Sequence, residues 1–137
     1  MKYILNTDGG SRGNPGPAGI GMVIVNFSKG NEVVWRHGAF IGNATNNHAE
    51  YQALIAGLTK AKELGIQELE CRLDSELLVK QLRKEYRVKH KDLAPLFVKA
   101  WNLAGSFARI SFYHVPREEN KEADACVNEA LDEALKK

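Results

Sequence analysis

Short apolar runs separated by turn-forming residues occupy the first third of the chain. Apolar-rich runs lie at 3–7, 18–26 and 32–41. Five glycines and two prolines stand at 9–19, between the first two runs, and Ser-Lys-Gly-Asn stands at 28–31, between the second and third. Residues of these types favour turns, and Gly9, Gly10 and Gly13 are expected to allow positive φ angles. The pattern therefore predicts three strands with short connections, which together form an antiparallel meander.

The apolar period becomes helical after a polar loop. Apolar residues recur at three- and four-residue spacing over 49–64 and a glycine follows, which predicts a helix. Asn47 is expected to cap this helix, and Glu50, three residues later, completes a capping box. The run at 68–73 predicts a fourth strand that ends at Asp74. A helix between two strands makes a parallel crossover, so this strand is expected beside the first one and in the same direction.

The second half of the chain continues to alternate helix and strand signals. These signals predict helices at 76–84, 94–104 and 121–136 and a strand at 109–115. Ser75 and Asn120 are expected to cap the first and the last of these helices. The order β-β-β-α-β-α-α-β-α predicts an α/β fold with a five-stranded mixed sheet flanked by helices. At 137 residues, one domain covering 1–137 is expected.

Composition fits a globular protein. Hydrophobic residues make up 44% of the chain and charged residues 26%, which are ordinary values for such a protein. No apolar run approaches the roughly 20 residues of a membrane-spanning helix, so no membrane partner is expected. Cys71 and Cys126 are too few for a disulfide framework and lack metal-ligand spacing. Because no signal peptide is visible at the start, a cytoplasmic protein with two free, buried thiols is expected.

Charge is distributed unevenly although the net charge is only +2. Six lysines and arginines stand at 80–92 against two carboxylates, whereas seven carboxylates stand at 118–133 against one lysine. A basic segment beside an acidic one is compatible with a phosphate-backbone partner. The alternative is an ordinary solvated helix end and loop, and charge alone leaves both interpretations open.

Four carboxylates stand at comparable places in the predicted elements. Asp8 and Asp74 follow strands, and Glu50 and Asp124 lie in the first turns of helices. In a crossover fold both kinds of position meet at the carboxyl edge of the sheet. Taken singly, Glu50 is explained as a capping acid and Asp124 as a complement to the helix dipole.

A convergence of these four acids has a chemical consequence. Close carboxylates repel by about 4 kcal/mol per pair at an effective dielectric constant of about 20. Divalent cations relieve such repulsion, and oxygen-only ligands suit Mg²⁺, with Mn²⁺ as the alternative. Two such ions about 4 Å apart can activate water and stabilise the leaving oxygen in phosphodiester hydrolysis. The pattern therefore predicts a metal-dependent hydrolytic site.

Four segments of the chain carry a further signal. They are Asp8-Gly9-Gly10-Ser11-Arg12-Gly13-Asn14-Pro15-Gly16-Pro17-Ala18-Gly19, Thr45-Asn46-Asn47-His48-Ala49-Glu50, Leu73-Asp74-Ser75 and Asn120-Lys121-Glu122-Ala123-Asp124. In order and spacing they resemble the signature segments of the type 1 ribonuclease H family, over essentially the whole chain. The resemblance implies the ribonuclease H-like fold. It also implies a two-metal endonuclease that cuts the RNA strand of RNA/DNA hybrids, leaving 3′-hydroxyl and 5′-phosphate ends.

The resemblance also implies roles for individual residues. The four acids match the family's ligands for two metal ions. The residues that match substrate contacts are Gly9, Gly10, Ser11, Arg12, Asn14, Thr45, Asn46 and Asn47. The asparagines match contacts to the hybrid's minor groove, and Thr45 matches a contact to a DNA phosphate. Amides and hydroxyls can read 2′-hydroxyls and backbone without reading base sequence. A solvated Arg12 is an equal alternative to a phosphate contact.

The sequence departs from many members of the family in two places. Their catalytic histidine lies in a loop before the last helix, whereas the loop here, 115–120, holds Arg117, with His114 just before it. Both are candidate auxiliary residues, although Arg117 stays charged and is a poor proton shuttle. Many members also bind the hybrid through a Trp-rich basic protrusion. That protrusion is missing here, since Tyr86 is the single aromatic residue of the basic segment 80–91. Hybrid affinity is therefore expected to be modest and salt-sensitive.

Two hypotheses follow from the sequence. The first is an active ribonuclease H that works as a monomer, with double-stranded RNA as a second candidate substrate. The second is a catalytically silent module that binds hybrids or double-stranded RNA. The presence of all four acids argues against the second, because a silent module has little reason to keep a repulsive cluster.

Overall fold

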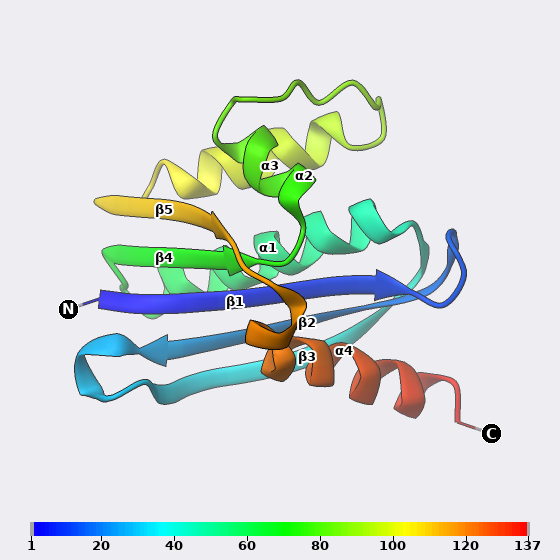
Figure 1. Cartoon of the computed structure of the whole chain (residues 1–137), viewed down its shortest axis with the longest axis horizontal. Helices are drawn as coiled ribbons and strands as arrows, with labels where there is room; N and C mark the ends of the chain where they lie inside the picture. The colour runs from blue at the N-terminus through cyan, green and yellow to red at the C-terminus, as the bar shows by residue number, and fades with distance from the viewer. Residues whose placement is uncertain (1, 137) are drawn as a thin grey trace.

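The structure is a computed structural model that describes residues 2–136 (Figure 1). Its strands are β1 (Lys2–Ser11), β2 (Gly16–Asn26), β3 (Glu32–Ala44), β4 (Glu68–Leu73) and β5 (Arg109–His114). Its helices are α1 (Asn46–Glu63), α2 (Glu76–Leu82), α3 (Ala94–Ala104) and α4 (Lys121–Ala134), with two 3₁₀ turns, η1 (Phe27–Lys29) and η2 (Arg117–Glu119). Among the described residues, no helix is both long enough and apolar enough to cross a membrane.

The five strands form one mixed sheet in the order β3-β2-β1-β4-β5. β1 pairs antiparallel with β2, and β2 pairs antiparallel with β3. β1 and β5 each pair parallel with β4. The predicted mixed sheet is confirmed, and so is the crossover through α1 that places β4 beside β1. The ladder between β1 and β4 ends with Thr7 opposite Leu73, so Asp8 and Asp74 follow at the same edge of the sheet.

Helices cover both faces of the sheet (Figure 1). α1 packs on β1 and β2 and also contacts α3, whereas α4 packs on β2, β3 and β1. Glycines in the strands allow α4 to approach closely. A Cβ atom on Gly21 would lie 2.1 Å from the carbonyl oxygen of Ala123, and one on Gly38 would lie 2.4 Å from that of Cys126. The sheet is therefore shaped to receive α4, which carries Asp124.

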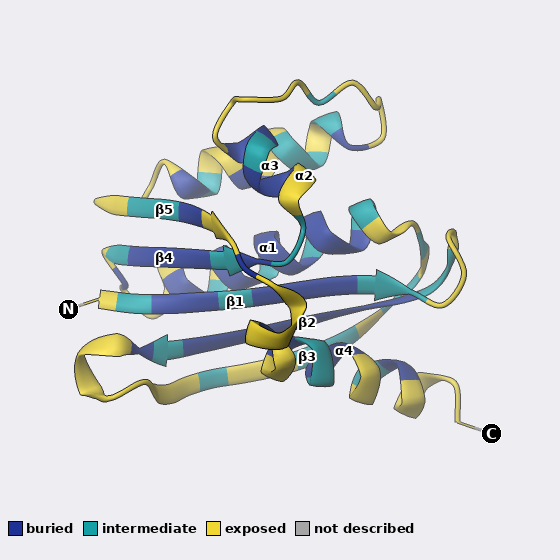
Figure 2. Ribbon diagram, in the orientation of Figure 1, coloured by how far each residue is buried: buried dark blue, intermediate teal, exposed yellow. Residues whose placement is uncertain are grey.

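The main hydrophobic core lies between the sheet and the layer formed by α1, α2 and α3 (Figure 2). Leu5 and Ile24 of the sheet and Leu54 and Leu58 of α1 are among its fully buried members. Apolar side chains of this size contribute about 1.5–3 kcal/mol each when they are buried. This packing fixes the positions of β1, β4 and α1, the elements next to which the acids lie. Both cysteines are free and buried, as the sequence predicts.

The first strand is longer than the sequence predicts. β1 continues through Gly9 and Gly10 to Ser11, because these residues stay in the antiparallel ladder with β2. Asp8 is therefore not at the end of its strand, although it lies one residue beyond the pairing with β4. Of the three glycines that were expected to adopt positive φ angles, only Gly13 does so, at 90°. Gly9 and Gly19 instead allow close packing, because a Cβ atom on Gly9 would lie 2.3 Å from Ala49 of α1 and one on Gly19 would lie 3.2 Å from Leu131 of α4.

The predicted cap of α1 is wrong. Thr45 is the N-cap, and its hydroxyl oxygen accepts a hydrogen bond from the backbone N–H of His48 at 3.2 Å. β3 continues to Ala44, and α1 therefore begins at Asn46, ahead of the expected cap Asn47. The prediction that Ser75 caps α2 is confirmed, because its hydroxyl oxygen accepts a hydrogen bond from the N–H of Leu78 at 3.3 Å.

Other predicted boundaries differ by a few residues. The helix predicted to reach Leu64 ends at Glu63, and Leu64 is exposed rather than part of the core. The last helix ends at Ala134 rather than at 136, and Leu135, which follows it, is exposed as well. α2 ends at Leu82 rather than at 84, and β5 ends one residue early, at His114.

Candidate active site

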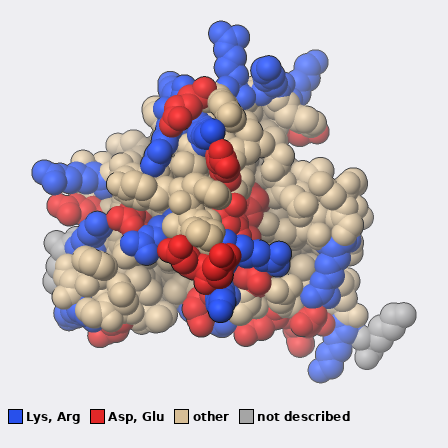
Figure 3. Space-filling view, in the orientation of Figure 1, with Lys and Arg blue, Asp and Glu red and all other residues tan. Residues whose placement is uncertain are grey.

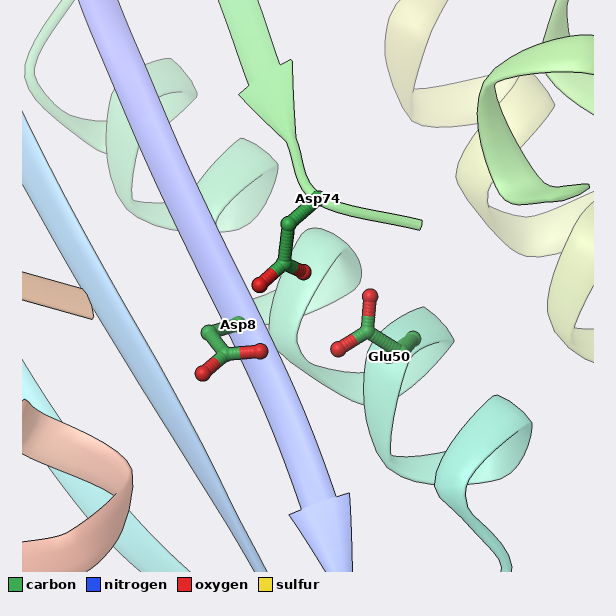
Figure 4. A group of neighbouring side chains, drawn as sticks. All are labelled: Asp8, Glu50 and Asp74. Carbon is green, nitrogen blue, oxygen red and sulfur yellow. The ribbon is translucent and has the colours of Figure 1, made fainter. Parts of the chain in front are cut away.

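Three of the four predicted acids meet at the edge of the sheet. Asp8 comes from β1, Glu50 from α1 and Asp74 from the residue that follows β4. One carboxylate oxygen of each lies within 4.8 Å of the others. Figure 4 shows these side chains pointing toward one another. Oxygen donors in this arrangement suit a hard divalent cation such as Mg²⁺ or Mn²⁺.

Glu50 holds its place through β1 rather than through its own helix. Its Oε1 accepts a hydrogen bond from the backbone N–H of Gly9 at 2.6 Å, so it is not the capping-box acid that the sequence predicted. The two backbones are close enough that a Cβ atom on Gly9 would lie 2.3 Å from the carbonyl carbon of Ala49. The other oxygen of Glu50, Oε2, is buried and has no hydrogen-bond partner among the described residues. A buried anionic oxygen without a partner fits a metal ligand.

Burial raises the pKa values of all three acids, and repulsion between carboxylates adds to this effect at Asp8 and Glu50. Burial is the largest cause of the raised pKa of Asp8, followed by repulsion from Glu50 and Asp74. The pKa of Glu50 is raised by burial and then by Asp74, against the hydrogen bond from Gly9. Burial also raises the pKa of Asp74. A cation would remove this penalty and allow the three groups to ionise together.

Asp124 lies next to this triad without joining it. It lines the same pocket, whose volume is about 450 Å³, and it contributes to the raised pKa of Asp8. Its Oδ1 lies 3.4 Å from Nη2 of Arg117, and its side chain is 29% exposed. Arg117, which lies in η2, also lines the pocket. His114, the other predicted auxiliary residue, is exposed at the end of β5 and is absent from this lining.

The predicted substrate contacts divide between two adjoining pockets. The acid pocket includes Gly9, Gly10, Ser11, Arg12, Asn46 and Asn47. Asn14 and Thr45 line a second pocket of about 820 Å³, which shares Asn46 and Asn47 with the first.

Hydrogen bonds and an ion pair connect these polar groups. Oδ1 of Asn46 accepts from the backbone N–H of Ser11 at 2.8 Å, and Oδ1 of Asn14 accepts from the backbone N–H of Asn46 at 3.0 Å. Arg12 pairs with Asp132 of α4 at 2.6 Å. These contacts connect the segment between β1 and β2 to the start of α1 and to α4.

Asn120 occupies the N-cap position of α4, as predicted, but its side chain has a different role. Its side chain makes no capping hydrogen bond in α4. It is 1% exposed and donates from Nδ2 to the carbonyl oxygen of Thr7 at 2.8 Å, while its Oδ1 accepts from Nδ2 of Asn6 at 3.0 Å. It also favours the ionised form of Asp74 through a hydrogen bond that lowers the pKa of that carboxyl. Asn120 thus connects the start of α4 to β1 and to the acid cluster.

Two polar residues of α4 had no role assigned to them from the sequence: Asn128, which lines the pocket, and Asp132, which pairs with Arg12, a residue of the lining. Nδ2 of Asn128 lies 3.5 Å from Oδ2 of Asp124, and Asn128 lines the pocket. Asn128 lies four residues after Asp124, on the same face of the helix, and this spacing could have predicted its place beside Asp124. Asp132, the partner of Arg12, lies a further turn along α4 and could have been found by the same spacing.

The site and fold together define a class of protein: an α/β domain whose clustered carboxylates suit metal-dependent phosphoryl chemistry. The sequence matches the reverse transcriptase-like family over residues 6–130. The crystal structure of RNase H1 from Halobacterium salinarum superposes with a TM-score of 0.93 at 44% identity, covering 97% of this chain and 99% of that one. The chain belongs to the type 1 ribonuclease H family, a family of enzymes, as the four sequence segments predict.

Two further relatives support this membership. A bifunctional protein of Mycobacterium tuberculosis is 47% identical over 134 residues, which are 98% of this chain and 36% of the relative. A compost-derived RNase H1 in complex with an RNA/DNA hybrid superposes with a TM-score of 0.91 at 43% identity, covering 97% of this chain and 99% of that one. The chain spans little more than a third of the mycobacterial protein's length.

Proposed function

We propose that this protein is a metal-dependent endoribonuclease that hydrolyses the RNA strand of RNA/DNA hybrids. The observation that carries the proposal is the close triad of Asp8, Glu50 and Asp74, in which one buried oxygen of Glu50 is left without a partner. The relative that is in complex with a hybrid supports the choice of substrate. All four predicted acids line one pocket, which argues against a silent binding module.

The acids would hold two Mg²⁺ ions, with Mn²⁺ as the alternative. Asp8, Glu50 and Asp74 supply oxygens that already lie close together, and Asp124 supplies a carboxylate at the rim. When bound, such ions activate a water molecule and stabilise the leaving oxygen of a phosphodiester. The protein's own contribution is to hold four carboxylates at fixed positions on its strands and helices.

The residues around the acids would bind and orient the hybrid. Asn14, Asn46 and Asn47 offer amides to the minor groove, where 2′-hydroxyls distinguish the RNA strand. Thr45 would contact a DNA phosphate. Arg117 is better placed than His114 to hold a phosphate, because it lines the acid pocket. The products would carry 3′-hydroxyl and 5′-phosphate ends.

The test incubates the purified protein with a labelled RNA/DNA hybrid, matched double-stranded RNA and single-stranded RNA, in Mg²⁺, in Mn²⁺ and in chelator. We expect cleavage of the hybrid's RNA strand that is lost in chelator and reduced at least about 100-fold in Asp74→Asn. Glu63→Gln, which removes an equal charge from the exposed end of α1, should cut at the wild-type rate.

Each outcome has a defined meaning. Hybrid binding without cleavage in any metal would favour the silent module. Cleavage by Asp74→Asn at the wild-type rate would place the site elsewhere. The double-stranded RNA arm decides the second candidate substrate. The single-domain organisation, the monomeric state and the cytoplasmic location of the protein remain predictions from the sequence.

A further inference from the structure

A basic and aromatic surface lies on the far side of α2 from the acids. It covers the loop between α2 and α3 and the exposed side of α3, and we call it the basic–aromatic patch. Its members are Lys80, Lys84, Tyr86, Arg87, Phe97 and Trp101. Figure 3 shows blue side chains projecting over this loop at the top of the molecule, and Figure 2 shows the loop as largely exposed.

Aromatic rings in the patch are open to solvent and stand next to cations. Tyr86 is 51% exposed and Trp101 is 40% exposed. The ammonium of Lys80 lies 4.8 Å from the ring centre of Tyr86, and that of Lys84 lies 4.6 Å from the ring centre of Trp101. Phe97 stacks on Trp101 with ring centres 6.0 Å apart. A cavity of about 570 Å³ opens beside Tyr86 and Phe97.

The positive charge of the patch is only partly neutralised. Lys80 pairs with Glu76 at 2.9 Å, and Glu85 also lines the cavity. Neither Lys84 nor Arg87 forms an ion pair with any of residues 2–136. Two cations therefore remain available for an anionic ligand.

Lys84 adopts a backbone conformation that favours glycine. Its φ angle is 61°, in the left-handed region. It follows the last residues of α2, where its N–H bonds to the carbonyl of Gln81 at 3.0 Å and the N–H of Glu85 bonds to that of Lys80 at 2.8 Å. This is the Schellman arrangement, which usually has glycine at this position. A lysine here carries a conformational cost, and the side chain that it gains lies over Trp101.

We propose that the basic–aromatic patch binds a stretch of single-stranded nucleic acid. Exposed aromatic rings stack on unpaired bases, whereas the bases of a duplex have their faces covered. The free cations of Lys84 and Arg87 suit the phosphates that connect those bases. The partner is a strand of RNA or DNA, and its binding requires neither the acids nor a metal ion, so it goes beyond hybrid cleavage.

The patch is placed to receive an unpaired strand near the cleavage site. Asp74 lies just before α2, and Lys84 lies just after it. α2 has seven residues, so the two ends are about 10 Å apart along the helix. At about 3.4 Å per nucleotide along a stacked strand, this distance corresponds to about three nucleotides. An unpaired extension of a hybrid could therefore reach the patch while the paired part occupies the acid pocket.

The first test measures binding by fluorescence anisotropy, with labelled 12-nucleotide oligo-uridine and oligo-thymidine in chelator. Tyr86→Leu keeps an apolar side chain but removes the stacking ring, and we expect about tenfold weaker binding. Phe40→Leu is the matched control, because Phe40 is an aromatic residue of β3 that is 46% exposed. It should bind as the wild type does. Tighter binding of one oligonucleotide would identify RNA or DNA as the preferred strand.

The second test separates binding from folding. Lys84→Gly places glycine where the backbone favours it, so thermal stability should stay equal or rise. Binding should nevertheless weaken, and the slope of log affinity against log salt should fall by about one. Lys29→Gln removes an exposed lysine elsewhere and should change neither quantity.

Three results would overturn the proposal. The first is undetectable binding of both oligonucleotides at low salt. The second is wild-type affinity in both Tyr86→Leu and Lys84→Gly. The third is displacement of the oligonucleotide by polyglutamate as efficiently as by an unlabelled strand, which would indicate an acidic protein partner instead. Because these measurements use chelator and no cleavage, a failure of the nuclease proposal would leave them unaffected.

Discussion

Gly9 lies where β1 meets the backbone of α1. A Cβ atom there would come within 2.3 Å of Ala49, so Gly9→Ala must push the helix away from the strand. We expect a loss of about 2 kcal/mol of unfolding free energy, typical of overpacking in a filled space. The displaced helix would also move Glu50 from the N–H of Gly9, which now lies 2.6 Å from it. Urea denaturation and hybrid cleavage measure the two effects.

Gly10→Ala is the matched control for this change. The nearest atom to a Cβ on Gly10 is Oδ1 of Asn46 at 3.9 Å, an ordinary contact, so stability should change by less than about 0.5 kcal/mol. Equal losses in the two variants would mean that glycine matters here for backbone freedom rather than for close packing. The sequence assigned Gly9 and Gly10 the same role, because only the packed structure shows which of them faces a helix.

Element positions were easier to predict from the sequence than their ends were. The periods of 49–64 and 94–104 predicted helices that the structure contains, since apolar spacing reflects burial on one face. The cap of α1 was misassigned because Thr45, Asn46 and Asn47 are all good capping residues. The choice among them depends on where β3 stops pairing with β2, which is a non-local event.

Asn120 tests how α4 is fixed to the sheet. Its amide bonds to the carbonyl of Thr7 and to the side chain of Asn6 across more than 110 residues of sequence. Asn120→Ala leaves these buried groups without partners, which costs about 1–3 kcal/mol. We expect faster amide hydrogen exchange in α4, with exchange in α3 affected less. Asn102→Ala, on the exposed side of α3, should leave both helices unchanged, and equal protection in α4 of Asn120→Ala would refute this anchoring role.

At the scale of the whole molecule, the fold and the acid positions were predictable for one reason. A crossover connection leaves few ways to place β4 beside β1, and each way brings Asp8 and Asp74 to the same edge. The sequence could not show how closely the four carboxylates approach one another. Asp8, Glu50 and Asp74 form a tight group, whereas Asp124 is held toward Arg117 and Asn128. That difference depends on how closely α4 sits on the sheet.

In the absence of metal, the buried charge of the acids should lower the free energy of unfolding of the protein. Glu50 is 7% exposed, with one oxygen unpartnered. Glu50→Gln keeps an oxygen for the N–H of Gly9 but removes the buried charge. In chelator it should therefore gain about 1 kcal/mol, or about 3 °C in melting temperature. Saturating Mg²⁺ should raise the melting temperature of the wild type, since binding at 100 times Kd stabilises by about 2.7 kcal/mol.

Glu63→Gln is the control for this comparison of melting temperatures, which calorimetry measures. Glu63→Gln removes a charge from the exposed end of the same helix, so it should melt like the wild type both in chelator and in Mg²⁺. Glu50→Gln should respond to Mg²⁺ much less than either. If Glu50→Gln melts lower than the wild type in chelator, the buried carboxylate stabilises the fold by itself. If it still gains the full increase in Mg²⁺, the ion binds away from the triad.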